Sequence, residues 1–497
     1  MSGKAVLAVV FVLALGIGVR LYRLTAPPLD FHPTRQMHSA LIARQLYLRW
    51  RPGLVTPLER EQRELGNRMA RYEPPIFEAL VARTCLIDRH WGFHLWVARL
   101  YDLLFWLLGA WGLFLLARRA AGETAAVLSL GYWMLLPFAV QASRSFQPDP
   151  LMTVILVWAA YFACGWADAA ADEALPKQRL YAALAVVFGA AAGIVKAYAV
   201  LFALGIWAGM AVWRYRQRVW RSVWAWLGAL GVALPVAAVY FFMPRNAVNS
   251  GFIRTWVLGA VRHWLSPLVY GGWLNQASMA FGGGWLLFAV VGVALSKPRL
   301  RALALGWLAA YIAYGLAVPV HIATHSYYQL PLLPLTALGV GAGAAALEEP
   351  IRRQRKIWQA AVVAALVVSA LYSTGITAWE IRNAHTEQKA QMLQTLGKRL
   401  PEGKIIALTE AYGYPLMYYA NRNVDFWPTS RYMEFFSQGQ AAFADIFKRR
   451  TRGHHYFLVT DMEEFYRQNA LRRYLYAHYP VVMEGDGYIL FDLSRGK

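Results

Sequence analysis

The chain has 497 residues, of which 58% are hydrophobic and only 16% are charged. Soluble domains have about 45–50% apolar and about 25% charged residues, so this composition excludes an ordinary soluble protein. Repeated apolar runs close to the length of a bilayer span predict an α-helical polytopic membrane protein. The net charge of +22 falls largely in short loops between the predicted spans, and no basic-aromatic module accompanies it. We therefore expect no nucleic-acid partner.

Eleven membrane spans are predicted in chain order. They lie near residues 5–22, 92–117, 124–142, 150–167, 180–195, 197–213, 222–243, 280–296, 302–320, 328–347 and 357–378. The first apolar run follows Lys4 as in a signal peptide, but no small-residue cleavage site precedes Arg20, so we expect a retained helix. The fifth and sixth spans meet at Lys196. These two spans are therefore either short or a re-entrant pair.

Basic residues alternate between successive loops and predict the orientation. The richer set comprises Arg118, Arg119, Lys177, Arg179, Arg214, Arg216, Arg218, Arg221, Lys297, Arg299, Arg301, Arg352, Arg353, Arg355 and Lys356. The positive-inside rule assigns these loops to the cytoplasm. We thus expect a plasma (inner) membrane protein with a cytoplasmic N-terminus and with residues 24–91 and the C-terminal region outside. Arg20 and Arg23 lie at the predicted outer end of the first span, which contradicts the rule at that point.

Two regions have a composition unlike that of the spans. Residues 24–91 contain many arginines and prolines, and the helical spacing of apolar residues over 36–50 predicts an amphipathic helix on the bilayer surface. We assign this loop to a transmembrane domain over 1–380. Residues 385–497 predict a small α/β domain outside the membrane, with strands near 404–409 and 455–460. A hairpin is expected around Gly485-Asp-Gly487.

Ionisable side chains gather at the predicted outer ends of the spans rather than mid-membrane. They are Asp30, His32, Arg35, Glu73, Arg144, Asp149, Lys196, His321 and His325. Transporters more often carry such residues near the midplane. The arrangement favours chemistry at the outer membrane surface.

Five stretches, taken in order, carry a resemblance to a known superfamily. They are Pro28-Leu-Asp30 with Ser39–Arg44, Tyr72–Phe77, Ala98–Asp102 with Leu116–Arg119, Ser143–Pro150, and His325–Pro331. The pattern resembles polyprenyl-phosphate-sugar-dependent glycosyltransferases of the GT-C type, such as the protein O-mannosyltransferases and aminoarabinose lipid A transferases. The resemblance implies transfer of a sugar from a polyprenyl phosphate to an acceptor hydroxyl on the outer face, with inversion. The acceptor would be a protein, a lipid or a glycan.

The resemblance also implies a catalytic carboxylate in the first outer loop. Asp30 is the first candidate for the base that accepts the hydroxyl proton, although it also suits a turn after Pro27-Pro28. Relatives often carry an Asp-Glu pair that falls here on Arg35-Gln36, so this chain departs from the family pattern. Glu73 is the alternative base. Its carboxylate would equally compensate a helix dipole.

The remaining candidates would bind substrate. Arg35 and Lys196 are candidate phosphate contacts, or else interfacial anchors, and Arg144 is assigned to the same substrate site. Asp149 before Pro150 has the form of a helix cap, and it would bind the acceptor or orient loops.

His325 and Tyr328 would shape the donor pocket, although tyrosines are also common in the aromatic belt. Arg99 and Asp102 are expected to neutralise each other inside the bundle. No cofactor is expected because arginine and lysine can stabilise a departing monophosphate. A divalent metal is left open.

Two other classes of function fit the same pattern. One is a transporter or flippase of lipid-linked saccharides, and the other is a catalytically inactive scaffold of the same fold. The chain shows no duplication of its hydrophobic pattern, which many transporters have, and it has no nucleotide-binding loop. An assay of sugar transfer distinguishes these classes.

Overall fold

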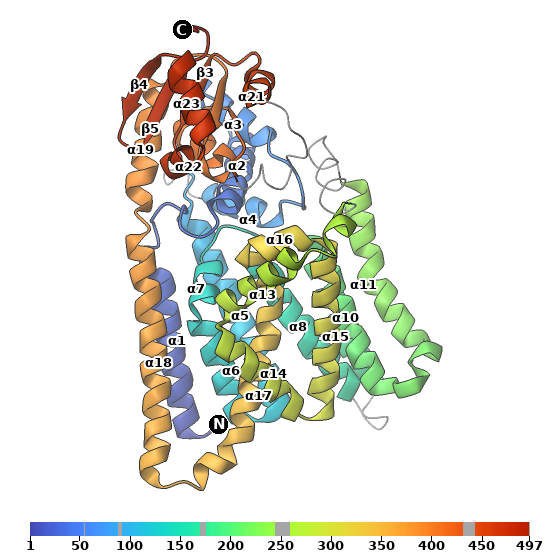
Figure 1. Ribbon diagram of the computed structural model, residues 1–497. Helices are drawn as coiled ribbons and strands as arrows, with labels where there is room; N and C mark the ends of the chain where they lie inside the picture. Colours follow the sequence, from blue (N-terminus) through green and yellow to red (C-terminus); the bar gives the residue numbers. More distant parts are fainter. Residues whose placement is uncertain (54, 88–91, 169–174, 244–258, 431–442, 497) are drawn as a thin grey trace. The chain divides into compact units, whose positions relative to one another are not determined.

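The computed structural model describes residues 1–53, 55–87, 92–168, 175–243, 259–430 and 443–496 (Figure 1). The chain forms two compact units, each built from separate stretches. The first contains Met1–Thr25, Ala70–Phe77 and Trp96–Asn383, and the second contains Ala26–Met69, Glu78–Leu95 and Ala384–Lys497. The last stretch of the second unit thus begins at Ala384, close to the predicted domain boundary at 380–385. It also takes in most of the loop 24–91, which the sequence analysis assigned to the transmembrane domain.

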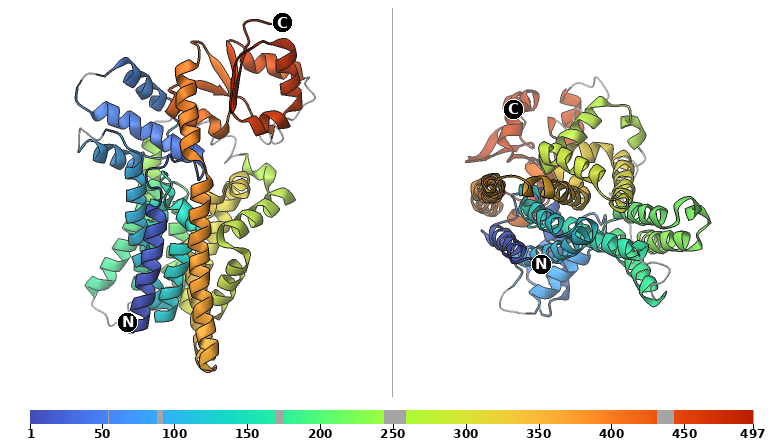
Figure 2. Two further views of the ribbon diagram at one scale, coloured as in Figure 1. Left: turned by 90° about the vertical axis from the view of Figure 1, so that its left-hand side faces the viewer. Right: turned by 90° about the horizontal axis from the view of Figure 1, so that it is seen from below.

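The first unit is a helical membrane domain. Its helices are α1 (Gly3–Leu21), α5 (Trp96–Ala121), α6 (Glu123–Leu135), α7 (Pro137–Ala142), α8 (Asp149–Asp168), α9 (Leu175–Val195), α10 (Ala199–Tyr215), α11 (Val223–Phe242), α13 (Pro267–Phe281), α14 (Gly283–Leu295), α15 (Pro298–Ala317), α16 (Pro319–Thr324), α17 (Leu333–Arg352) and α18 (Lys356–Asn383). Short 3-10 turns are η1 (Arg216–Arg221), η3 (Ala260–His263) and η4 (Ser326–Leu332). Helices α1 and α18 lie side by side in Figures 1 and 2.

Each of the eleven predicted ranges contains a helix. Within the described part of the chain, eight helices are long and apolar enough to cross a membrane, or nine if the bent pair α13–α14 counts as one span. The pair bends by 90° at Gly282, whose φ is +74°. Helices α6 and α10 have only 13 and 17 residues. The integral membrane character is confirmed, whereas the count of eleven remains a prediction.

Arginines at the end of α1 are bonded inside the protein. Arg20 is buried, and its guanidinium donates to the Ser143 hydroxyl (2.7 Å) and to the carbonyls of Gly16 and Met134 (2.8 Å each). The last carbonyls of a helix need donors from elsewhere. Arg99 donates to the carbonyl of Leu24 (2.9 Å), just beyond this helix end. Packing therefore accounts for the position of Arg20 at this end of α1.

Glycines bring helix backbones into direct contact, as two pairs of helices show. A Cβ atom on Gly292 of α14 would overlap the carbonyl oxygen of Gly339 on α17. One on Gly306 of α15 would overlap the carbonyl oxygen of Gly205 on α10. Small residues allow this approach, which is the usual basis of helix packing in membranes.

The second unit contains a five-stranded sheet. Its strands are β1 (Ile405–Leu408), β2 (Val424–Phe426), β3 (Tyr456–Val459), β4 (Val481–Gly485) and β5 (Tyr488–Asp492). Their order is β2-β1-β3-β5-β4, with β1 parallel to β2 and β3 and with β5 antiparallel to β3 and β4. The two predicted strands and the hairpin are confirmed, and β2 adds a strand that was not predicted.

Helices and short turns complete the second unit. They are α2 (Pro33–Trp50), α3 (Pro57–Asn67), most of α4 (Ile76–Cys85), α19 (Thr386–Arg399), η5 (Glu410–Gly413), η6 (Leu416–Ala420), α21 (Phe443–Thr451), α22 (Met462–Arg467) and α23 (Asn469–His478). Ile406 and Phe457 of the strands share a hydrophobic core with Phe447, Phe465 and Leu475 of the helices.

The helix predicted over 36–50 forms, but not as a helix lying on the bilayer. Residues 36–48 of α2 are all buried, and α2 packs against α3, η5 and η6. The Arg44 guanidinium donates to the carbonyl of Tyr418 (2.9 Å) and lies 4.2 Å from its ring centroid. Burial on all faces explains why the apolar periodicity was misleading. The prediction of a surface helix is therefore wrong.

Candidate functional site

A buried ion pair joins the start of α8 to the break between α9 and α10. The Nζ atom of Lys196 lies 3.0 Å from Oδ2 of Asp149, with side chains only 7% and 0% exposed. The Tyr198 hydroxyl donates to Oδ1 of the same carboxylate at 2.7 Å. The predicted junction of two helices at Lys196 is confirmed, since α9 ends at Val195 and α10 begins at Ala199. This turn presents both Lys196 and Tyr198 to Asp149.

Tyrosine rings extend this ion pair into a larger cluster. The Lys196 ammonium lies 5.4 Å from the ring centroid of Tyr198 and 5.9 Å from that of Tyr327, distances that suit cation–π attraction. Tyr314 of α15 packs 4.5 Å from Tyr198. Tyr328 lies 4.6 Å from Tyr327 in η4. Two rings therefore lie against the cation, and two further rings pack on those two.

Two histidines flank the tyrosines. The ring of His325 lies 5.8 Å from Tyr327 and 6.1 Å from Tyr328, while that of His321 lies 5.4 Å from Tyr328. Burial lowers the pKa of His321 to about 3, and the neighbouring His325 contributes. His321 is thus neutral near pH 7.

Glu73 lies at the same end of the first unit as the ion pair. Phe77, four residues later, packs 5.9 Å from Phe105 of α5 and 5.3 Å from Phe146. The Glu73 carboxylate interacts electrostatically with Tyr240. The Tyr240 hydroxyl in turn donates to the carbonyl of Ile194 at 3.3 Å, two residues before Lys196. A chain of contacts therefore connects Glu73 to the Lys196 turn.

The other predicted residues have partners of their own. Arg144 is buried, and its guanidinium donates to the carbonyl of Tyr22 at 2.9 Å, just beyond the end of α1. Asp30 and Arg35 belong to the second unit. Oδ1 of Asp30 accepts hydrogen bonds from the Phe31 amide (3.0 Å) and from the Gln36 side chain (3.2 Å). Asp149, Lys196, His325 and Tyr328 are the predicted residues that form one cluster.

Arg99 and Asp102 do not pair as predicted. The Arg99 guanidinium donates to the carbonyls of Leu24 (2.9 Å) and Arg144 (3.3 Å). Asp102 is fully buried, and its carboxylate accepts no hydrogen bond from any residue in the described part of the chain. Backbone carbonyls compete for the guanidinium, so only a longer-range attraction between the two side chains remains.

Sequence reasoning also missed Tyr198 and Tyr314. Tyr198 lies two residues after Lys196, and that proximity was the available signal. Tyr314 lies within an apolar span with no polar neighbour in sequence that would mark it. Among the described residues, no group of three or more His, Cys, Asp or Glu side chains is placed to hold a metal ion.

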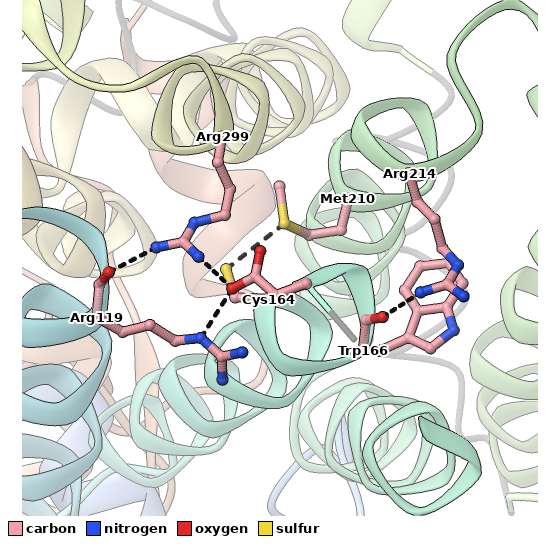
Figure 3. A network of polar contacts seen from close by, with 7 residues as sticks. Arg119, Cys164, Trp166, Met210, Arg214 and Arg299 are labelled. Carbon is pink, nitrogen blue, oxygen red and sulfur yellow. Dashed lines mark hydrogen bonds and ion pairs between the residues drawn. The ribbon is translucent and has the colours of Figure 1, made fainter. Parts of the chain in front are cut away.

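The far end of α8 carries a second polar network (Figure 3). Asp168 accepts from Arg119 at 2.8 Å and also from Arg299, which donates to the carbonyl of Arg119 at 2.6 Å. The guanidinium of Arg214 lies 5.3 Å from the Trp166 ring. Three helices, α5, α8 and α15, therefore meet at one carboxylate. With 20 residues in α8, this network lies about 30 Å from Asp149.

Comparisons with known proteins agree with this architecture. The family model described as dolichyl-phosphate-mannose-protein mannosyltransferase matches residues 73–242. The crystal structure of ArnT from Cupriavidus metallidurans bound to undecaprenyl phosphate is 15% identical, with a TM-score of 0.54 over 99% of this chain and 98% of that one. No curated protein matches the chain.

A second solved structure is also similar. Archaeal oligosaccharyltransferase AglB from Archaeoglobus fulgidus, in complex with an inhibitory peptide and a dolichol-phosphate, is 13% identical with a TM-score of 0.54. The match covers 98% of this chain and 74% of that one. The chain thus has the fold of the GT-C glycosyltransferases. The predicted resemblance is confirmed at the level of this superfamily.

Proposed function

We propose that the protein is a membrane glycosyltransferase that transfers a sugar from a polyprenyl phosphate to an acceptor hydroxyl outside the cytoplasm. The observation that carries the proposal is the buried Lys196–Asp149 pair beside the tyrosine–histidine cluster. The two structural neighbours, bound to undecaprenyl phosphate and to a dolichol-phosphate, support a lipid-phosphate donor.

Lys196 is the proposed contact for the donor phosphate. Its ammonium is held by the Asp149 carboxylate and lies against the rings of Tyr198 and Tyr327. A fixed cation in a site poor in water stabilises charge that develops on a leaving group. Asp149 then acts by orienting Lys196. His325 and Tyr328 pack on Tyr327, whose ring lies against the same cation, and would bind the phosphate or the sugar.

The proposed reaction is a direct displacement. The acceptor oxygen forms a bond to the anomeric carbon while the bond from that carbon to the phosphate oxygen breaks. The electron pair leaves with the phosphate, which becomes a lipid monophosphate, and the hydroxyl proton passes to a carboxylate. One displacement inverts the anomeric centre.

Glu73 is the base that we favour. It belongs to the same unit as Lys196 and is connected to the Lys196 turn through Tyr240. Asp30 is the alternative, and one of its carboxylate oxygens already accepts two hydrogen bonds. Arg35, in the same unit as Asp30, is a second candidate phosphate contact. The proposed orientation keeps the N-terminus in the cytoplasm and the 385–497 domain outside the plasma (inner) membrane.

Transfer from a defined donor tests the proposal. Purified protein in lipid nanodiscs is given radiolabelled polyprenyl-phosphate hexoses or aminoarabinose together with protein, lipid and glycan acceptors. Transfer by the wild type and its loss in Lys196→Met are expected. Movement of the donor across proteoliposomes without transfer would indicate a flippase instead. Donor binding without either activity would indicate an inactive scaffold.

A further inference from the structure

Two buried polar side chains lie beside the proposed site without hydrogen-bond partners. Both carboxylate oxygens of Asp102 and both polar side-chain atoms of Gln147 lack a partner among the described residues, and both side chains are 0% exposed. Buried polar groups in proteins are nearly always paired, because leaving them unpaired costs stability. A pair retained at such a cost requires an explanation.

The fold brings both residues to the junction of α5 with the turn 143–148. Arg99, one turn before Asp102 on α5, donates to the carbonyl of Arg144 in this turn. Phe105 of α5 and Phe146 of the turn both pack on Phe77. Gln147 follows Phe146 directly. Asp102 and Gln147 therefore both belong to segments that meet at this junction.

The same junction leads directly to the ion pair. Asp149, two residues after Gln147, binds Lys196 and Tyr198. Asp102 is close enough to Asp149 to interact with it electrostatically. Any sugar whose phosphate is bound by Lys196 would therefore be near this junction.

We propose that Asp102 and Gln147 bind hydroxyl groups of the donor sugar. The assignment rests on the proposed function. A carboxylate accepts hydrogen bonds from hydroxyl groups, and an amide both donates and accepts, which suits a ring with neighbouring hydroxyls. Because the two side chains are fully buried, the sugar reaches them through movement of the turn 143–148. The ligand class is a hydroxylated sugar ring, and the pair would contribute to the choice of sugar.

Variants of matched size test the assignment. Asp102→Leu and Gln147→Met remove the polar groups at similar volume, and Asp102→Asn keeps hydrogen bonding without charge. The control is Ser129→Ala, which removes another buried polar group, a hydroxyl that donates to the Ala337 carbonyl at 2.8 Å. Each protein is assayed for melting temperature, for binding of sugar-free undecaprenyl phosphate, and for transfer from the glycosylated donor.

We expect Asp102→Leu to melt no lower than the wild type, since it removes an unpaired buried group. Binding of sugar-free undecaprenyl phosphate should stay within about twofold, whereas kcat/KM for the donor should fall by about 10- to 100-fold, the effect of one or two lost hydrogen bonds. Asp102→Asn should recover part of the loss. A donor that lacks the contacted hydroxyl should have a low kcat/KM with the wild type. Its kcat/KM with Asp102→Leu should be no lower.

Two results would overturn the assignment. One is unchanged kcat/KM in Asp102→Leu and Gln147→Met. The other is an equal loss of sugar-free phosphate binding and of transfer, which is what a purely structural role produces. Failure of the proposed function itself gives a different result, because the wild type would then transfer no sugar from any donor.

Discussion

The Lys196 ammonium and the Asp149 carboxylate form an ion pair of 3.0 Å in a place closed to solvent. Taking both charges out of water is costly, and removal of one partner leaves the other uncompensated. The pair therefore makes each of its members necessary for folding as well as for the proposed chemistry. The two roles are separable by experiment.

A double-mutant cycle separates them. Lys196→Met and Asp149→Leu should each lower the free energy of unfolding by about 3–5 kcal/mol, because each leaves one buried charge unpaired. The double variant should recover most of that loss, as measured by chemical denaturation. Transfer activity should stay absent in the double variant. Recovery of activity together with stability would show that Lys196 serves only to neutralise Asp149.

Tyr198 should matter through its hydroxyl. Tyr198→Phe removes the 2.7 Å hydrogen bond to Asp149, and hydrogen bonds to charged groups contribute about 1.5–3 kcal/mol. We expect a lower melting temperature and a donor KM raised by up to about tenfold, because Lys196 would be held less firmly. Tyr314→Phe is the matched comparison on the neighbouring ring and should have a smaller effect. Equal effects would assign the role to ring packing.

The two candidate bases differ in their expected kinetics. Glu73→Gln should reduce kcat by at least about 100-fold with little change in donor KM, since general base catalysis contributes about 10²–10⁴-fold. Asp30→Asn should change kcat little, because the Asn side-chain oxygen can still accept the hydrogen bonds from the Phe31 amide and from Gln36. The reverse result, in which only Asp30→Asn loses kcat, would identify Asp30 as the general base.

His321 should make the first unit sensitive to acid. Its pKa is lowered by burial to about 3 in the folded protein, against 6.5 ordinarily. Between these values the unfolded chain binds the proton and the folded one does not, so stability is lost as pH falls from about 6.5 towards 3 at up to about 1.4 kcal/mol per pH unit. Thermal melts of His321→Gln recorded from pH 7 to 4 should show a loss of stability per pH unit that is smaller than in the wild type by this amount. An unchanged slope would contradict the prediction.

The network at Asp168 offers a test of stability without chemistry. Asp168→Asn leaves Arg119 and Arg299 without their shared counter-charge and should lower the melting temperature. Because about 30 Å of α8 separates it from Asp149, donor KM should not change. A large change in KM would mean that α8 transmits strain from one end to the other.

Much of the membrane domain follows from the sequence, because apolar runs of bilayer length leave few other possibilities. The break at Lys196 was visible as a charge between two apolar runs. The number of spans was not visible in the sequence, since α6 and α10 are short and α13 bends away from α14 at Gly282. The burial of α2 was also hidden, because apolar periodicity does not reveal which partner covers a helix.

The cluster around Lys196 was predicted in part. Charged residues such as Asp149 and Lys196 stand out in an apolar chain, and the break between helices placed Lys196 at an end. Tyr198 and Tyr314 do not stand out among 27 tyrosines and 21 tryptophans. The mutual pairing of Arg99 and Asp102 was wrong because a local spacing rule ignores backbone carbonyls contributed by α1 and the turn 143–148.

The contact of α10 with α15 has a consequence for the relative position of the tyrosine rings beside Lys196. Tyr198 precedes α10 and Tyr314 belongs to α15, while Gly205 and Gly306 let these two helices touch backbone to backbone. At that point backbone lies against backbone, and the nearest side-chain atom to Gly205 is the small Cβ of Ala310. The spacing of the two phenol rings consequently depends on glycines within the apolar part of α10 and α15.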